Sequence, residues 1–128
     1  MSERNKTVVI ADDEAHVRLY MKALLKTLNF DVVGEAKDGV EATTLALEKR
    51  PDLVLLDLNM PMRTGEEALE DILGKWPQAR VVMLSSVADR LSVEHCLTLG
   101  ALHFIRKDCS PAEIRTILTD LIQEGAPT

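Results

Sequence analysis

Five short runs of apolar residues recur along the chain, and they constrain its fold more than any other feature. Most of these runs are continuous and do not alternate with polar residues. Continuous runs of this length are typical of strands in a parallel sheet that is covered on both faces. They predict five strands, at 8–11, 32–33, 53–56, 81–84 and 102–105.

Amphipathic helices are expected between and after these strands. Apolar residues at helical spacing predict helices over 17–28, 69–76 and 114–122, and weaker patterns predict helices over 40–49 and 89–99. Strands and helices therefore alternate along the whole chain.

The residues that start and stop helices agree with this alternation. Ser110, Pro111 and Glu113 form a capping-box pattern with proline at the first helical position. Gly100 stands where the fourth helix should end, and Pro51 stands just after the second. These signals place helix boundaries in the expected gaps between the strands.

Five strand–helix units in 128 residues imply one α/β domain with right-handed crossovers. We expect a flavodoxin-like (βα)5 three-layer sandwich with a parallel sheet in the order 2-1-3-4-5. The domain should span 1–128, with a core of about 7–124 and a frayed end at 125–128. In such a sheet, ligands bind outside the carboxyl ends of the strands, where the order switches between the first and third.

Composition excludes several functional classes. The chain has 21 Asp and Glu against 15 Lys and Arg, which argues against the basic surface of a nucleic-acid binder. An aromatic content of 3% argues against base-stacking platforms. The chain has no apolar run of membrane-spanning length and no signal-peptide core near Met1. We therefore expect a cytoplasmic protein with reduced thiols at Cys96 and Cys109.

Polar residues follow four of the predicted strands. Asp12 and Asp13 follow the first strand, and Asp57 follows the third. Ser85 ends the fourth strand and Lys107 the fifth. Taken singly, Asp12 or Asp13 could cap a helix, Ser85 could be a turn residue and Lys107 could be solvated. Because the carboxyl ends of parallel strands meet at one edge, we expect all five to lie together.

These residue types have a joint chemical purpose. Three crowded carboxylates repel one another, and a hard divalent cation such as Mg²⁺ relieves that repulsion and favours phosphate oxygens. A carboxylate beside such a cation can attack a phosphoryl group and form an acyl phosphate. Lys107 could neutralise the phosphoryl oxygens and Ser85 could donate to one of them. The set predicts a carboxylate that accepts a phosphoryl group.

With these motifs, the chain resembles the receiver domain of two-component response regulators, the CheY-like superfamily. The resemblance covers about Thr7 to Glu124. Two features, Lys107-Asp108 and the stretch 33–36, are similar to receivers of NarL-like regulators. Many receivers have a cis proline after the lysine, whereas Asp108 predicts a trans bond here. The matching motifs are 8–14, Asp38-Gly39, 51–61 with Gly65, 81–86, Gly100-Ala101 and 104–107.

The resemblance implies a phosphoacceptor and a metal site. Asp57 would take a phosphoryl group from a phosphohistidine on a partner kinase. Asp13 would bind Mg²⁺ directly, and Asp12 would bind it mainly through water. Asp57 and the backbone carbonyl of Asn59 would complete the protein ligands, with Mn²⁺ as a substitute metal.

The resemblance also implies a switch. Lys107 would contact the phosphoryl group and the Ser85 hydroxyl would close on it. Phe104 stands at the switch-aromatic position, where tyrosine is common, and would move with Ser85. Their movement would reshape the face formed by the last two helices and the last strand.

The expected partners follow from that scheme. Upstream stands a sensor histidine kinase or a histidine phosphotransfer protein, and downstream a protein partner or an output domain. Many receivers form a homodimer through the same switching face. We expect no enzymatic activity beyond self-phosphorylation and dephosphorylation, and no direct contact of this domain with membrane or nucleic acid.

Other functions fit the residues less well. The chain could act as a single-domain receiver, or as the N-terminal receiver of a NarL-like DNA-binding regulator whose helix-turn-helix lies beyond Thr128. A haloacid-dehalogenase-type phosphatase needs an acid two residues after its nucleophile, where Asn59 stands. A flavodoxin needs a hydroxyl-rich phosphate loop, where Asp12, Asp13 and Glu14 would repel phosphate. A degenerate, unphosphorylated receiver is disfavoured, because every expected site position carries a competent side chain.

Overall fold

The computed structural model describes residues 5–86 and 88–124, and these form a five-stranded parallel sheet with five helices. The sheet order is β2-β1-β3-β4-β5, as predicted. The strands are β1 (Lys6–Ala11), β2 (Phe30–Ala36), β3 (Leu53–Asp57), β4 (Val81–Ser85) and β5 (His103–Arg106).

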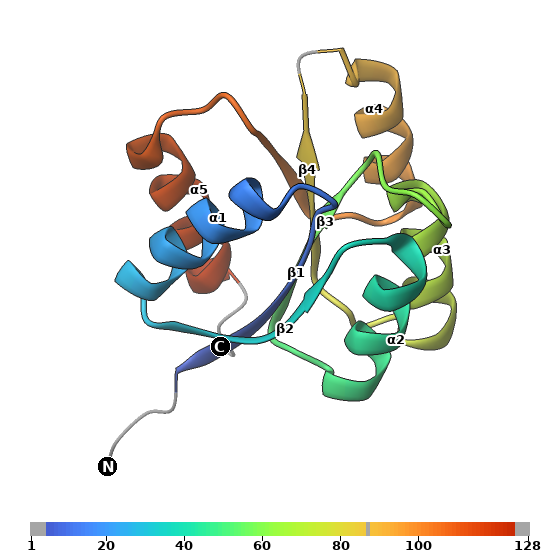
Figure 1. Cartoon of the computed structure of the whole chain (residues 1–128), viewed down its shortest axis with the longest axis horizontal. Helices are drawn as coiled ribbons and strands as arrows, with labels where there is room; N and C mark the ends of the chain where they lie inside the picture. The colour runs from blue at the N-terminus through green and yellow to red at the C-terminus, as the bar shows by residue number, and fades with distance from the viewer. Residues whose placement is uncertain (1–4, 87, 125–128) are drawn as a thin grey trace.

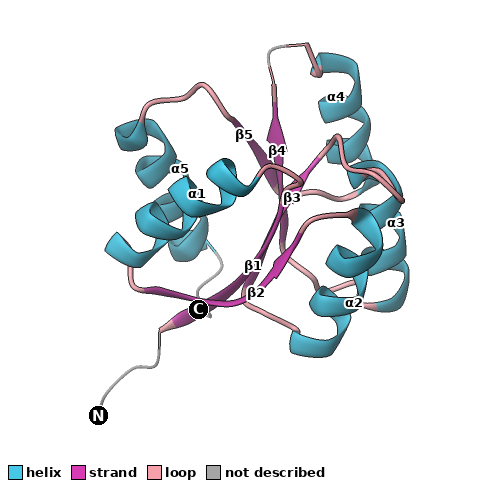
Figure 2. Cartoon of the chain, in the orientation of Figure 1, coloured by secondary structure: helices cyan, strands magenta, loops and turns pink. Residues whose placement is uncertain are grey.

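The helices form two layers, one on each face of the sheet. Figure 1 shows α1 and α5 on one face and α2, α3 and α4 on the other, and Figure 2 shows the sheet between them. The predicted three-layer flavodoxin-like sandwich is therefore confirmed. The helices are α1 (Ala15–Thr27), α2 (Gly39–Lys49), α3 (Gly65–Lys75), α4 (Arg90–Leu99) and α5 (Pro111–Glu124).

The continuous apolar runs arise because both faces of the sheet are buried. Successive side chains of a strand point to opposite faces. In β3, Leu53 and Leu55 pack into the core on the α1 and α5 side, whereas Val54 and Leu56 pack into the core against α2 and α3. All four are buried, so no position of the run can be polar without cost.

The local helix signals act as predicted. The Ser110 hydroxyl accepts the Glu113 backbone N–H, and the Glu113 carboxylate accepts the Ser110 N–H and hydroxyl. Gly100 ends α4 with a φ of 124°, in the region that favours glycine. Arg50 ends α2 in the left-handed conformation directly before Pro51.

Most element boundaries differ from the sequence expectation by a few residues, and three of these differences are informative. β5 covers His103–Arg106 and not 102–105, because Leu102 is 44% exposed and its N–H bonds to Val81 before the strand begins. β2 is longer than its apolar pair, since an edge strand tolerates half-exposed polar residues. Trp76 lies just after α3 and not within it, half-buried, with the Arg50 guanidinium 5.3 Å from its ring centre.

Two further expectations concern the ends and the connections. The frayed end predicted at 125–128 lies outside the described residues. Within the described part of the chain there is no cis peptide bond, so the Lys107–Asp108 bond is trans, as predicted. No helix in that part is both long and apolar enough to cross a membrane.

Candidate functional site

Three buried polar side chains lie together at the carboxyl end of the sheet. Asp12, Asp57 and Ser85 are the buried polar residues of the part of the chain that the structure describes, and each is at most 2% exposed. The strand register explains their meeting. Ala11 pairs with Leu56, so the next residues, Asp12 and Asp57, come side by side. Because burying such groups costs free energy, their presence indicates that this edge of the sheet is a functional site.

The carboxylates form one cluster. Asp12, Asp13 and Asp57 each place one oxygen within 4.8 Å of the others. Asp13 is exposed, so the cluster opens to solvent on its side. Oxygen ligands at this spacing suit a hard divalent cation such as Mg²⁺.

Lys107 approaches this cluster from the loop after β5. Its Nζ lies 2.9 Å from Asp12 Oδ2, 3.1 Å from Asp57 Oδ1 and 3.6 Å from Glu14 Oε1. This ion pair is the contact that compensates the buried Asp12 Oδ2, which has no further hydrogen-bond donor. A buried carboxylate oxygen that depends on one ion pair and faces two further carboxylates fits a metal or a metal-bound water as an added partner.

The electrostatics of the site favour added positive charge. Burial, and after it the negative charge of Asp12, raise the pKa of Asp57 to about 6, although Lys107 and the Asn59 N–H oppose this rise. Burial pulls the pKa of Lys107 down, but its contacts with Asp12 and Asp57 outweigh burial and raise it. At neutral pH, Lys107 therefore stays protonated, and Asp57 is ionised at an electrostatic cost because it is buried beside Asp12.

The loop after Asp57 is held tightly against the start of α3. The Gly65 N–H bonds to the Leu58 carbonyl, and a side chain at Gly65 would come within 2.2 Å of the Asp57 carbonyl oxygen. Any larger residue at Gly65 would therefore displace Asp57. Gly65 belongs to the receiver-like motif together with 51–61, and this close contact is the physical reason why a glycine stands there.

The predicted switch residues lie beside α4. Ser85 is buried at the end of β4, and its carbonyl accepts the Lys107 N–H. Phe104 is half-buried and lines a groove with Val93 and Leu97 of α4. The structure thus brings Ser85 and Phe104 to one groove between β5 and α4.

Two residues at this edge were missed by sequence reasoning. The Arg18 guanidinium donates to the Asp12 carbonyl at 2.7 Å and pairs with Glu35, which fixes the loop after β1. Asp89 accepts hydrogen bonds from Ser86 and Asn59. Arg18 and Asp89 belong to no sequence motif, because their partners lie far away in the sequence or in irregular loops.

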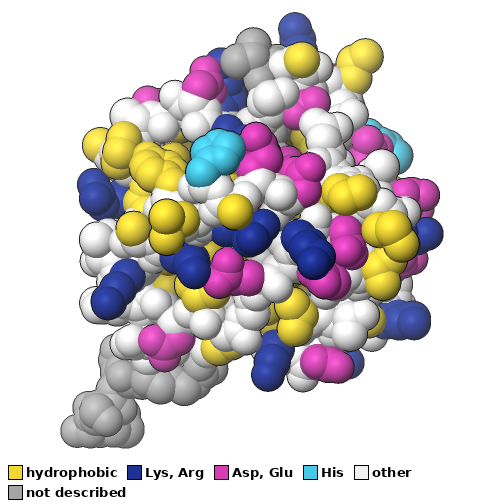
Figure 3. Space-filling view, in the orientation of Figure 1, with side chains coloured by type: hydrophobic (Ala, Val, Ile, Leu, Met, Phe, Trp, Pro, Cys, Tyr) yellow, Lys and Arg dark blue, Asp and Glu magenta, His cyan; other side chains and the backbone are white. Residues whose placement is uncertain are grey.

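The face of the molecule seen in Figure 3 carries charges of both signs. Figure 3 shows acidic and basic side chains interspersed over the face in view, with acidic side chains grouped beside a histidine in its upper part. No broad basic patch is visible on this face, in line with the net charge of -6.

Comparison with known proteins places this geometry in a family. Residues 8–119 match the family model of the response regulator receiver domain. The chain is 39% identical to the chemotaxis protein CheY of Listeria monocytogenes, over 78% of this chain and 84% of that protein.

Two solved structures share the fold. CheY in the CheX–CheY–BeF3–Mg complex from Borrelia burgdorferi superposes with a TM-score of 0.86 and 28% identity, over 91% of this chain and 89% of that one. The signal receiver domain of the response regulator NarL from Mycobacterium tuberculosis superposes with a TM-score of 0.85 and 30% identity, over 97% of this chain and 100% of that one.

Proposed function

Because the chain belongs to the family of response regulator receiver domains, we propose that it is a switch controlled by phosphorylation of Asp57. Receivers of this family are phosphoacceptors of two-component signalling. The observation that carries the proposal is the buried Asp57 carboxylate, held between Lys107 and the carboxylates of Asp12 and Asp13.

The proposed reaction is a transfer from a phosphohistidine of a sensor kinase or histidine phosphotransfer protein. An Asp57 carboxylate oxygen attacks phosphorus and forms the P–O bond of an acyl phosphate, while the P–N bond breaks. The electron pair of that bond returns to the imidazole nitrogen. With a pKa of about 6, Asp57 is mostly ionised and nucleophilic at neutral pH.

Asp13, Asp12, Asp57 and the Asn59 carbonyl are the proposed metal ligands. Mg²⁺, or Mn²⁺ in its place, would neutralise charge on the phosphoryl oxygens when bound. The buried Oδ2 of Asp12 and the oxygens within 4.8 Å support this ligand set. Asp13, the exposed member, is suited to direct coordination from the solvent side.

Lys107, Ser85 and Phe104 have the remaining proposed roles. Lys107 turns from Asp57 to a phosphoryl oxygen, and the Ser85 hydroxyl donates to another. Phe104 follows Ser85 into the groove beside α4. This movement biases an existing equilibrium between two arrangements of α4, β5 and α5. That face would then bind a downstream partner or a second copy of the chain.

The wider setting is also proposed. The domain covers 1–128 with a core of about 7–124, works in the cytoplasm, and does not itself contact membrane or nucleic acid. The Lys107-Asp108 pair and the 30% identity to the NarL receiver support a second arrangement. In that arrangement this domain regulates a DNA-binding domain beyond Thr128.

The test uses acetyl phosphate and Mg²⁺ with intact-mass measurement. The proposal predicts a gain of one phosphoryl group that is absent in Asp57→Ala and in a metal-free sample. No gain by acetyl phosphate, together with no binding of beryllofluoride, would contradict the proposal.

A further inference from the structure

One carboxylate ties together the two loops that flank Asp57. Asp89 Oδ2 accepts the Ser86 N–H at 2.8 Å and the Ser86 hydroxyl at 2.9 Å. The Asn59 side-chain amide donates to both Asp89 oxygens at 3.3 Å. Ser86 directly follows Ser85, and Asn59 lies two residues after Asp57. Asp89 therefore joins the β4–α4 loop to the β3–α3 loop, which leave the same edge of the sheet (Figure 1).

Asp89 also lies in the electric field of the site. Burial pulls its pKa up, but hydrogen bonds from Ser86 and Asn59 and the charge of Lys107 outweigh burial and lower it. An aspartate side chain is ionised at neutral pH, so Asp89 places a negative charge beside Ser86 and Asn59. It lies outside the carboxylate cluster of Asp12, Asp13 and Asp57. A metal held by that cluster would therefore leave the charge of Asp89 in place.

A phosphoryl group on Asp57 would disturb this arrangement. It adds a charge of about -1.5 to -2 and several strong acceptor oxygens. That charge is repelled by Asp89 and attracts the donors that Asp89 now holds. The loop that carries Ser85 must also move toward the phosphoryl group, and the bonds of Asp89 to Ser86 resist that movement.

We propose that Asp89 is a positioning residue that holds Ser86 and Asn59 in the unphosphorylated arrangement and so opposes phosphoryl binding at Asp57. The inference rests on the proposed function, whose site it regulates. Releasing the link separates the two loops that flank Asp57 and frees Ser86, so the segment that carries Ser85 can move more easily. Removal of Asp89 should therefore make the site more receptive.

The test measures the affinity for beryllofluoride with Mg²⁺, a phosphoryl mimic, by fluorine NMR titration. Asp89→Ala should bind about fivefold more tightly than the wild type, as expected for loss of hydrogen bonds to a charged group. Asn59→Ala cuts only one of the two links and should tighten binding less. The double variant should bind no more tightly than Asp89→Ala, because both changes act on one linkage.

Two control variants separate the linkage from net charge. Glu48→Gln also removes one negative charge, at an exposed residue near the end of α2 and outside the groove beside α4, and should leave the affinity unchanged. Asp89→Asn removes the charge but keeps an amide that can bond Ser86 and a rotated Asn59. At high salt, where charge effects between exposed groups are screened, it should match the wild type while Asp89→Ala stays tighter.

The outcomes separate this inference from the proposed function. A wild type that fails to bind beryllofluoride overturns the proposed function itself. If the wild type binds beryllofluoride and neither Asp89→Ala nor Asn59→Ala binds it more tightly, only the role of Asp89 is overturned. Equal tightening by Glu48→Gln also overturns that role. Thermal unfolding of each variant checks that the fold as a whole is kept.

Discussion

Strand β3 has an aspartate at each end, and the two are held in opposite ways. Asp52 precedes the strand, where its carboxylate accepts the Thr7 N–H at 2.7 Å and the Thr7 hydroxyl at 3.2 Å. The Thr7 hydroxyl in turn accepts the Asp52 N–H. Asp57 ends the strand, buried beside Asp12, with its pKa raised to about 6. The two residues are five positions apart. The Asp52 carboxylate is stabilised by hydrogen bonds, whereas the negative charge at Asp57 is only partly compensated by Lys107.

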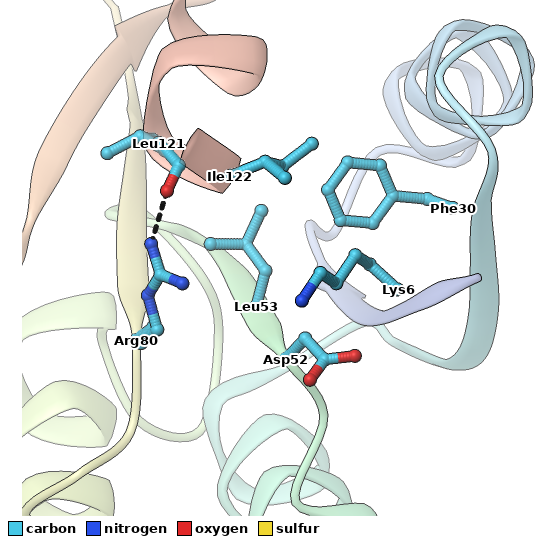
Figure 4. Close-up of a pocket in the computed structure, with 7 residues that line it drawn as sticks. All are labelled: Lys6, Phe30, Asp52, Leu53, Arg80, Leu121 and Ile122. Carbon is cyan, nitrogen blue, oxygen red and sulfur yellow. Dashed lines mark hydrogen bonds between the residues drawn. The ribbon is translucent and has the colours of Figure 1, made fainter. Parts of the chain in front are cut away.

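The surroundings of the two ends differ in the same sense. At the amino end, Lys6, Phe30, Asp52 and Leu53 line a small pocket beside the end of α5, where Arg80 donates to the Leu121 carbonyl at 2.5 Å (Figure 4). Polar groups there have partners close by, since Asp52 bonds to Thr7 of β1 and Arg80 bonds to α5. At the carboxyl end, the polar groups face one another across one lysine. The comparison indicates that the reactive site lies at the carboxyl end of the sheet, where negative charge is not fully compensated.

Loss of Lys107 should have the largest effect on the carboxyl end. Lys107→Met leaves Asp12 and Asp57 buried without a cation and should lower the free energy of unfolding by about 3 kcal/mol at pH 7. Urea unfolding measures this. The double variant Lys107→Met, Asp57→Asn should recover much of the loss. A double variant as unstable as the single one would show that repulsion between the carboxylates is not the cause.

Neutralising Asp57 should stabilise the metal-free protein in a pH-dependent way. The folded pKa of about 6 lies above the ordinary 3.8, so the stability from protonated Asp57 is fully present below about pH 4 and is lost as pH rises through 6. The stability of Asp57→Asn relative to wild type should therefore grow by about 3 kcal/mol between pH 4 and pH 8. Urea unfolding across this range, without metal, checks it. A difference that stays flat with pH would contradict the raised pKa.

Added Mg²⁺ should reduce the repulsion between the carboxylates of the site and so stabilise the fold. At about ten times its dissociation constant, the metal should raise the unfolding free energy by about 1.4 kcal/mol. Asp13→Asn changes an exposed carboxylate, so it should leave the metal-free protein almost as stable but remove the gain. Thermal scans with and without Mg²⁺ measure both. An undiminished gain in Asp13→Asn would place the metal elsewhere.

The amino end should give the smallest effect. Asp52→Ala removes the acceptor of the Thr7 N–H and should destabilise the protein by about 1 kcal/mol. It should leave phosphoryl uptake from acetyl phosphate unchanged, because no residue that the structure describes at that end touches the site. Unfolding and intact-mass measurements on this variant test the contrast directly. Reduced uptake at unchanged stability would show that the two ends are coupled.

Much of this contrast could be predicted from the sequence. Continuous apolar runs such as 53–56 require a sheet covered on both faces, and parallel strands bring Asp12, Asp57, Ser85 and Lys107 to one edge by topology alone. Because this prediction depends on chain direction and strand order, small errors in strand boundaries did not affect it. The shift of β5 by one residue, for example, left Lys107 at the same edge.

The rest depends on distances that a linear pattern does not contain. Asp52 and Asp57 both flank one apolar run, and only the structure shows that Thr7, 45 positions away from Asp52, supplies its hydrogen bonds. The sequence places Asp89 at the start of the predicted helix 89–99, and nothing in the pattern links it to Asn59, 30 positions away. Side-chain pairs of this kind are set by loop geometry, which the sequence signals here do not specify.

The most direct measurement locates the phosphoryl group between the two aspartates of β3. After reaction with acetyl phosphate and Mg²⁺, borohydride reduction converts an aspartyl phosphate to homoserine, and fragment-ion mass spectrometry reads its position. The account predicts homoserine at Asp57 and unmodified Asp52 in the same peptide. Modification at Asp52, or at any residue other than Asp57, would contradict it.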